Sequence, residues 1–203
     1  FTMKIILPDG SVEEAKDELR AIRHTASHVL AQAVKRLFPD AKIAIGPAIE
    51  DGFYYDFEAE PFSRETLDKL EAEMKKIVKE KPAIEQFFLS PEEGKKLMEE
   101  RNEPYKLELI AEHAAKGDTL SFYRQGEFVD LCAGPHLPDI SAIKAFKLTA
   151  TTGAYWRGDA KSRQLCRVYG SAFPKKEELE EYLKAREDAL KRDHNKLGRE
   201  LEY

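Results

Sequence analysis

The stretch that decides the fold is residues 17–39, DELRAIRHTASHVLAQAVKRLFP. Its apolar residues recur at helical spacing, at Ile22, Ala26, Val29, Ala33 and Leu37. We therefore predict a helix from residue 17 to residue 38 that ends before Pro39, because proline cannot continue a helix. Such a helix must bury its apolar stripe against other elements.

Strands and further helices follow along the chain. Ser63 is a predicted N-cap, and the run Ser90-Pro91-Glu92-Glu93 has the capping-box spacing with proline at the first helical position. We predict strands at 3–7, 43–45, 52–57, 84–89, 120–124, 128–131, 143–148 and 164–169, and helices at 64–81, 91–101, 106–115 and from 174 onward.

These elements predict an α+β fold, with an antiparallel sheet packed against helices and a cleft between them. A long C-terminal connector helix extends from this body. We divide the chain into a short N-terminal hairpin (1–16), a main domain (17–172) and the connector helix (173–203).

The composition is that of a globular domain, with 42% apolar and 35% charged residues in a chain of 203. No run approaches the roughly 20 apolar residues of a membrane helix, so we expect no membrane partner. Two cysteines, Cys132 and Cys166, are too few for a disulfide framework, which favours a reducing, cytoplasmic location.

The net charge of -5 argues against a protein that grips nucleic acid by bulk electrostatics. It leaves room for a local basic patch, or for ordinary solvated surfaces that carry the same residues. The candidates lie close together in the last third of the chain: Lys144, Lys147, Arg157, Lys161, Arg163 and Arg167.

Two short motifs bring together residues suited to chemistry. His24 and His28 lie about 40° apart on the predicted helix, on a face separate from the apolar stripe. The second motif is Cys132-Ala133-Gly134-Pro135-His136, at the end of a predicted strand, where the Gly-Pro turn can point thiol and imidazole the same way.

The two motifs allow two kinds of site. Three imidazoles and one thiolate form a ligand set suited to tetrahedral Zn²⁺. The same side chains without metal would form a hydrogen-bonding and acid–base cluster, since imidazole titrates near neutral pH.

The motifs extend into longer stretches that resemble a known family. RHTASH (23–28), GPAIEDGFYYDF (46–57), DLCAGPHLP (130–138) and GAYWRG (153–158) are similar to the editing domains of bacterial threonyl-tRNA synthetases. The related alanyl-tRNA synthetase editing domains would carry Cys-x-Gly-Thr-His in place of the sequence at 132–136.

The resemblance implies a proofreading hydrolase. Its substrate would be threonine tRNA that wrongly carries serine on the 3′-terminal adenosine, and its products serine and free tRNA. Only residues 3–14 resemble the start of the family's N-terminal ubiquitin-like domain. The synthetic core would lie in the full-length protein, so we expect this chain neither to activate threonine nor to charge tRNA.

A separate hydrolytic site answers a problem of discrimination. Serine lacks one methyl group of threonine, and a pocket gains only about 1–3 kcal/mol of selectivity from such a difference. A second site can exclude threonine by leaving no room for its methyl group. It needs positioned water, proton transfer and donors for the developing oxyanion, but no covalent nucleophile.

The resemblance also assigns roles to residues. His24, His28, Cys132 and His136 would line the pocket, with His24 transferring a proton near the ribose 2′-hydroxyl. His28 and His136 would hold substrate or water, and Cys132 would shape the amino-acid pocket.

Three further residues are candidates with an alternative each. Lys106 matches a family lysine near the catalytic water, although it also suits the start of a helix. Asp130 would bind the amine or hydroxyl of the substrate, or else be a strand-end carboxylate in a turn. Tyr55 would face the same cleft, or else be a core aromatic.

The resemblance to the threonyl branch favours a site that requires no cofactor. If zinc is bound, as in the alanyl relatives, its ligands would be His24, His28, Cys132 and His136. Two rival functions remain open: an alanyl-type zinc-dependent editing hydrolase, and a non-catalytic tRNA-binding module with structural histidines.

Overall fold

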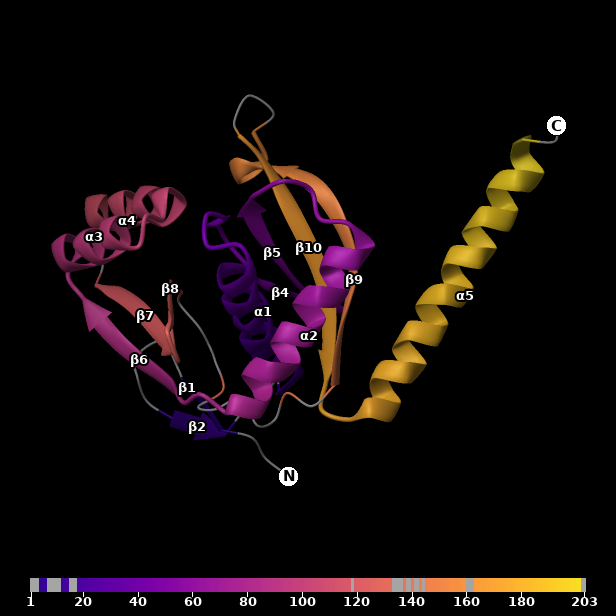
Figure 1. Ribbon diagram of the computed structural model, residues 1–203, viewed down its shortest axis with the longest axis horizontal. Coiled ribbons are helices and arrows are strands. Elements are labelled where there is room, and N and C mark those ends of the chain that lie inside the picture. The colour runs from indigo at the N-terminus through magenta and orange to yellow at the C-terminus, as the bar shows by residue number, and fades with distance from the viewer. Residues whose placement is uncertain are drawn as a thin grey trace.

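The structure is a computed structural model that describes residues 4–6, 12–14, 18–117, 119–132, 137, 140, 143, 145–159 and 163–201. The elements form two packed units and a projecting helix (Figure 1). A two-stranded antiparallel pair, β1 (Lys4–Ile6) and β2 (Val12–Glu14), lies near the N-terminus.

The first unit is built around α1 (Glu18–Leu37), the helix predicted from residues 17–38. Its apolar stripe is fully buried from Ile22 to Ala33, whereas Leu37, at the end of the helix, is 38% exposed. The stripe packs against an antiparallel sheet of β3 (Lys42–Ile43), β4 (Ala48–Ile49), β5 (Gly52–Glu58), β9 (Ala145–Tyr155) and β10 (Gln164–Phe173). The strand order is β3-β5-β10-β9, and β4 pairs with β5.

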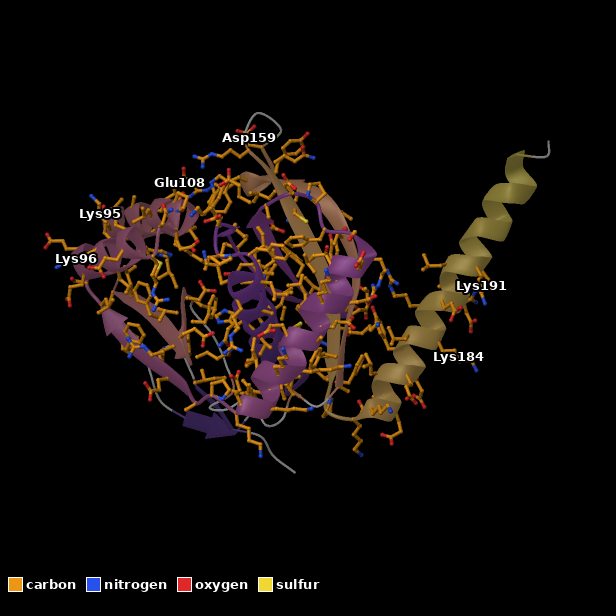
Figure 2. The ribbon with its side chains drawn as sticks, in the orientation of Figure 1. Lys95, Lys96, Glu108, Asp159, Lys184 and Lys191 are labelled. Carbon is orange, nitrogen blue, oxygen red and sulfur yellow. The ribbon has the colours of Figure 1, made fainter. Side chains whose placement is uncertain are left out.

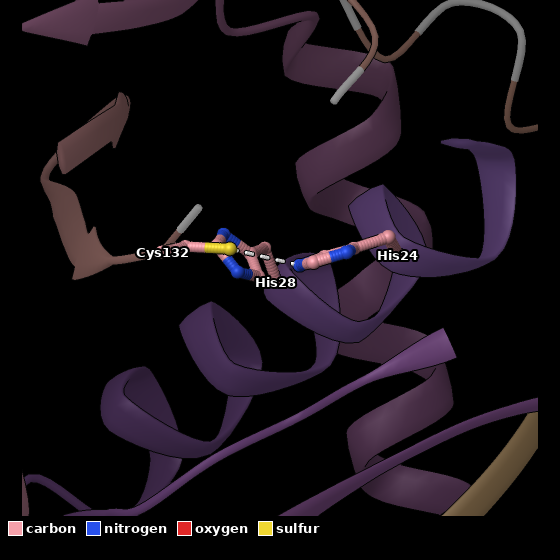
Figure 3. A group of neighbouring side chains, drawn as sticks. All are labelled: His24, His28 and Cys132. Carbon is pink, nitrogen blue, oxygen red and sulfur yellow. Dashed lines mark hydrogen bonds between the residues drawn. The ribbon is translucent and has the colours of Figure 1, made fainter. Parts of the chain in front are cut away.

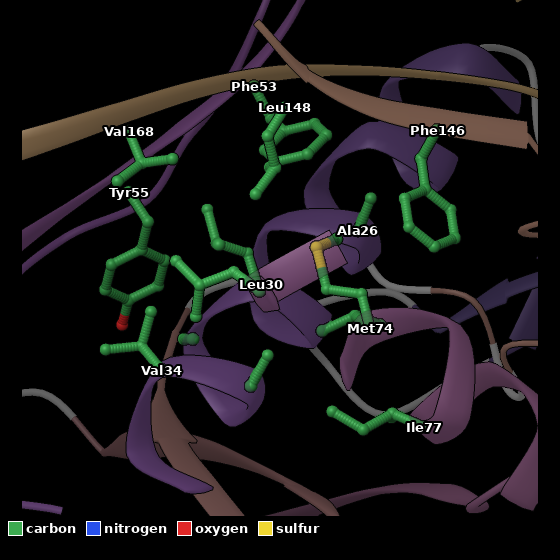
Figure 4. Close-up of a cluster of buried hydrophobic side chains, with 14 of the residues drawn as sticks. Ala26, Leu30, Val34, Phe53, Tyr55, Met74, Ile77, Phe146, Leu148 and Val168 are labelled. Carbon is green, nitrogen blue, oxygen red and sulfur yellow. The ribbon is translucent and has the colours of Figure 1, made fainter. Parts of the chain in front are cut away.

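The core between α1 and this sheet comes from alternation along β5. Phe53, Tyr55 and Phe57 point to the helix side and are fully buried. Figure 4 shows Phe53 and Tyr55 beside Leu30 of α1 and Met74 of the neighbouring helix. Fully burying side chains of this size contributes about 1.5–3 kcal/mol each.

The helix α2 (Arg64–Glu80) covers the same side of the sheet. The hydroxyl of Ser63 accepts from the backbone N–H of Thr66, which confirms the predicted N-cap. Glu71 is buried, and it accepts the backbone N–H of Leu148 at 2.7 Å, which ties α2 to β9.

The second unit contains the antiparallel sheet β6 (Ile84–Leu89), β7 (Leu120–Gln125) and β8 (Phe128–Leu131). The helices α3 (Pro91–Glu100) and α4 (Pro104–Ala115) lie over it and share its small apolar core, which includes Met98 and Phe122. Ser90 caps α3 as predicted, accepting the backbone N–H of Glu93 and donating to its carboxylate.

The C-terminal helix α5 (Lys176–Leu201) packs on the end of the five-stranded sheet through Leu179, which contacts the cluster of Ala145 and Phe173. Beyond these first turns it projects from the body (Figure 1). No helix in the described part of the chain has both the length and the apolar character to cross a lipid bilayer.

The predicted α+β class and the C-terminal helix are confirmed. The strands divide among separate sheets where one sheet was predicted. The strand predicted at 143–148 continues to Tyr155 as β9, because the whole length of β10 pairs with it. The domain boundaries at residues 16 and 172 stay a prediction.

Candidate active site

The face of α1 opposite the core is a second packing surface, made of polar side chains at four-residue spacing. His24, His28, Gln32 and Arg36 all contact the β7–β8 hairpin or the residue that follows it. We call this row of contacts the polar seam. It joins the first unit to the second, so the chemistry-bearing residues lie between the two units.

One end of the polar seam is a contact between His24 and Cys132. The Nε2 atom of His24 lies 2.9 Å from the Sγ atom of Cys132, and the rings of His24 and His28 are 5.3 Å apart (Figure 3). The thiol is half-buried, just past the end of β8. The structure thus brings the two sequence motifs together at Cys132.

Asp130, one residue before the end of β8, is the centre of a buried network. Its Oδ2 accepts the hydroxyl of Tyr55 at 2.7 Å and lies 3.2 Å from Nε2 of His28. Its Oδ1 lies 2.7 Å from the ammonium of Lys106, on the first turn of α4. Asp130 and Lys106 are 1% and 2% exposed, so they form an ion pair in the interior.

The network keeps Asp130 ionised. Burial by itself raises the pKa of this carboxyl, but the Lys106 ammonium, His28 and the Tyr55 hydroxyl outweigh burial and hold the pKa below its usual value. Burial and the adjacent Asp130 charge raise the pKa of Tyr55 well above its usual range, so its hydroxyl is a donor.

The two histidines are neutral at physiological pH. Burial lowers the pKa of His24 to about 3, with help from His28 and the positive charges of Arg20 and Lys106. Burial also lowers the pKa of His28 to about 4, against the opposing effect of Asp130. Because Asp130 can only accept, the Nε2 of neutral His28 carries the ring proton that faces it.

The far end of the polar seam contains residues that sequence reasoning missed. Gln32 donates to Glu127 at 2.9 Å and accepts from Gln125 at 2.7 Å, and Gln32 and Gln125 are buried. Arg36 binds Glu127 of the β7–β8 turn, with Nε 2.5 Å from Oε1. The available signal was the spacing itself, since Gln32 and Arg36 continue the period of four that starts at His24.

Tyr55 is a fully buried core aromatic whose hydroxyl also reaches the Asp130 network, and its predicted role in binding substrate stays a prediction. Its ring stacks on Phe57 in the core at 4.9 Å, while its hydroxyl binds Asp130. Gly46 lies directly against the ring, and a Cβ atom there would be only 2.0 Å from Tyr55 Cδ2. A side chain at position 46 would therefore displace Tyr55 from Asp130.

His136 and residues 133–135 lie outside the described residues. The chain just beyond them is anchored to α1, where Leu137 donates its backbone N–H to the hydroxyl of buried Thr25 at 3.1 Å. The role of His136 stays a prediction.

The residues present fit a metal ion in number and kind. One ligand atom each from His24, His28 and Cys132 lies within 4.8 Å of the others. The same atoms also have protein partners, since His24 contacts Cys132 directly and His28 faces Asp130.

The basic candidates do not form an open patch over the described residues. Lys147, Arg157 and Arg167 each pair with a carboxylate, those of Glu71, Glu112 and Asp56 respectively. The guanidinium of Arg163 lies over the ring of Tyr105. Lys144 and Lys161 lie outside the described residues.

Comparison with family models matches the part of the chain that follows α4. A family model described as the threonyl and alanyl tRNA synthetase second additional domain matches residues 120–169, which include Asp130 and Cys132. Together with the relatives below, this match confirms the resemblance to bacterial threonyl-tRNA synthetases.

Individual relatives cover nearly the whole chain. A threonine--tRNA ligase of Acetivibrio thermocellus is 62% identical over 183 residues, which is 90% of this chain and 29% of the relative. Those of Clostridium perfringens (58% over 202 residues) and Caldanaerobacter subterraneus subsp. tengcongensis (56% over 199 residues) each match over 31% of their own length. The chain thus spans about three tenths of the threonine--tRNA ligases that it matches.

Proposed function

We propose that this domain hydrolyses the ester that joins serine to the terminal adenosine of threonine tRNA. The observation that carries the proposal is the pairing of the His24–Cys132 contact with the buried network around Asp130. Asp130 and Cys132 also lie within the part that matches the synthetase family. The synthetic core of the longer relatives and the tRNA are the proposed partners.

The chemistry is attack of water on the ester carbonyl carbon. A new carbon–oxygen bond forms, the bond to the ribose oxygen breaks, and that oxygen takes up a proton that the attacking water gives up as the tRNA leaves. A neutral imidazole can relay this proton, and we assign that role to His24, whose ring meets Cys132 at the open end of the network. General acid–base help of this kind contributes about 10²–10⁴-fold.

Lys106 and Asp130 supply charge on both sides of the reacting group. The Lys106 ammonium can orient water or stabilise the developing oxyanion. A carboxylate has about four lone-pair sites, and Tyr55, His28 and Lys106 occupy three positions around Asp130. We assign the fourth to the amine or hydroxyl of a serine.

Cys132 and His136 complete the proposed pocket. Cys132 forms part of the wall beside the amino-acid side chain, where a methyl group would have to fit. His136 is assigned to holding substrate or water.

We propose that no resident metal is required. The positive charge of Lys106 lies close enough to both histidines to lower their pKa values, so it also opposes a second cation among them. Zinc bound to His24, His28, Cys132 and His136 would instead supply a polarised water. Stoichiometric zinc in protein purified without added metal, with chelator-sensitive hydrolysis, would contradict the metal-free proposal and support the alanyl-type alternative.

The test of the proposed function is deacylation of threonine tRNA charged with serine, beside the same tRNA charged with threonine. We expect serine to be released faster, and His24→Ala to slow its release by about 10²–10⁴-fold. The matched control is His113→Ala, on the last turn of α4, outside the site. Equal release of both amino acids would contradict the proposal, and tRNA binding without turnover would support a non-catalytic module.

A further inference from the structure

The helix α4, which carries Lys106, is fixed at its N-terminus by the first unit. The N-cap residue Glu103 makes no capping bond to its own helix. Its buried carboxylate instead pairs with Lys35 of α1 at 2.7 Å and accepts the backbone N–H of Ile43 at 2.9 Å. The start of α4 is therefore held by contacts outside its own unit.

A second attachment comes from the turn at the end of β9, the 3-10 helix η1 (Trp156–Gly158). The indole of Trp156 is buried and packs edge-on against the ring of Tyr105 at 4.8 Å. Its Nε1–H donates to the carboxylate of Glu108 at 2.5 Å. Trp156 thus contacts α4 at Tyr105, directly before Lys106, and at Glu108, two residues after it.

The turn is shaped to present Trp156 to α4. Arg157 has a left-handed backbone (φ 57°), its guanidinium lies 5.1 Å from the centre of the Trp156 ring, and it pairs with Glu112 one turn beyond Glu108. The backbone N–H of Trp156 bonds the carbonyl of Arg163 across the hairpin at 3.0 Å. Figure 2 labels Glu108 on the side of α4 toward this hairpin, near Asp159.

We propose that Trp156 is a positioning residue for Lys106, acting through Tyr105 and Glu108. This inference rests on the proposed function, and it gives a role to the GAYWRG stretch that the site itself does not use. Lys106 and Asp130 both lie in the second unit, whereas Trp156 follows β9 of the first unit. A shift of α4 therefore moves the Lys106 ammonium relative to Asp130 and the polar seam. A displacement of 1 Å in a catalytic group can cost about 100-fold in rate.

The experiment compares Trp156→Phe with wild type in hydrolysis of the seryl ester on threonine tRNA. Phenylalanine keeps an aromatic ring against Tyr105 but removes the donor to Glu108. We expect kcat to fall about 10- to 100-fold with KM changed less than threefold. Tyr155→Phe is the matched control at the adjacent exposed position, and it should retain wild-type kcat.

The same substitution in a Lys106→Met background separates positioning from general damage. If Trp156 acts through Lys106, Trp156→Phe should lower kcat no further there. A full additional loss in that background would overturn the proposal, as would unchanged kcat in the single variant.

A direct measurement on Lys106 keeps the proposal testable even if the wild-type chain hydrolyses no ester. The buried ammonium beside Asp130 should give a protected ¹H–¹⁵N NMR signal, assigned by its loss in Lys106→Met. We expect this signal to shift or broaden in Trp156→Phe and to stay in place in Tyr155→Phe. An unmoved signal in folded Trp156→Phe would contradict the proposal independently of the activity.

Discussion

The two faces of α1 carry side chains of opposite polarity. The face toward the five-stranded sheet is apolar, with Ala26, Val29 and Leu30 fully buried. The face toward the β7–β8 hairpin carries His28 and Gln32, which are 3% and 1% exposed. In the middle of the helix, burial is therefore nearly as complete on the polar face as on the apolar one, whereas His24 and Arg36, at the ends of the polar seam, are half-buried.

The difference lies in what each face demands of its partner. An apolar side chain needs only a surface of matching shape, so its contribution to stability is spread over many weak contacts. A buried polar group needs a specific donor or acceptor, because leaving it unsatisfied costs about 1–3 kcal/mol, and more for a charge. The polar seam is thus the less forgiving face, and the predictions below probe the contrast.

The largest effect is expected from Asp130→Asn. The substitution keeps the size of the side chain but leaves the Lys106 ammonium buried without a counter-charge. Breaking a buried ion pair in this way should lower the free energy of unfolding by about 3–5 kcal/mol, measured by urea denaturation. Asp68→Asn, in an exposed pair with Arg64, should cost at most about 1 kcal/mol.

The double variant Asp130→Asn with Lys106→Met distinguishes charge from packing. Removing both charges should restore much of the lost stability, because no unpaired ion remains. A double variant no more stable than Asp130→Asn alone would show that packing, and not charge, explains the loss.

The apolar face should respond to Leu30→Ala with a loss of about 2–5 kcal/mol in the free energy of unfolding. Leu30 has no exposed surface, and the substitution leaves a cavity under the sheet. Activity per folded molecule should change little, since no atom of the site is removed. Leu190→Ala, at a position 55% exposed on α5, is the control and should be neutral. Loss of activity in fully folded Leu30→Ala protein would contradict this separation of the two faces.

The most gradual effect, and the one specific to the polar face, is a dependence of stability on pH. The folded-state pKa values of about 3 for His24 and about 4 for His28 lie below the usual 6.5, so the unfolded chain binds more protons between these limits. The contribution of the two histidines to the free energy of unfolding is therefore fully present above pH 6.5. It falls as the pH drops toward 4, by up to about 1.4 kcal/mol per pH unit for each histidine.

Urea denaturation at several pH values from 7 to 4 measures this slope. The double variant His24→Asn with His28→Asn should lose stability less steeply over the same range. Equal slopes in the two proteins would mean that the histidines do not carry the effect.

The parts of the molecule that sequence could predict are those encoded locally. The helix around His24 and His28, the caps at Ser63 and Ser90, and the α+β class all follow from spacing within a few residues. The resemblance also indicated Lys106 and Asp130, which the structure brings within 2.7 Å of each other.

The parts that sequence could not predict depend on partners far along the chain. Glu127 lies 91 residues from Arg36, and Glu108 lies 48 residues from Trp156. No periodicity links such positions, and a glutamine or glutamate in a polar stretch has the same appearance whether it is solvated or buried. For the same reason the division of the strands into separate sheets was not foreseen.

The network around Asp130 can form only late in the synthesis of the chain. His28 and Tyr55 lie in the first third of the chain, whereas Lys106, Asp130 and Cys132 follow after 50 or more further residues. During synthesis the early histidines leave the ribosome as ordinary solvated side chains, with no counterpart to bind. The network can be assembled only when residue 132 has emerged and the two units have docked, so an unfinished chain cannot yet contain it.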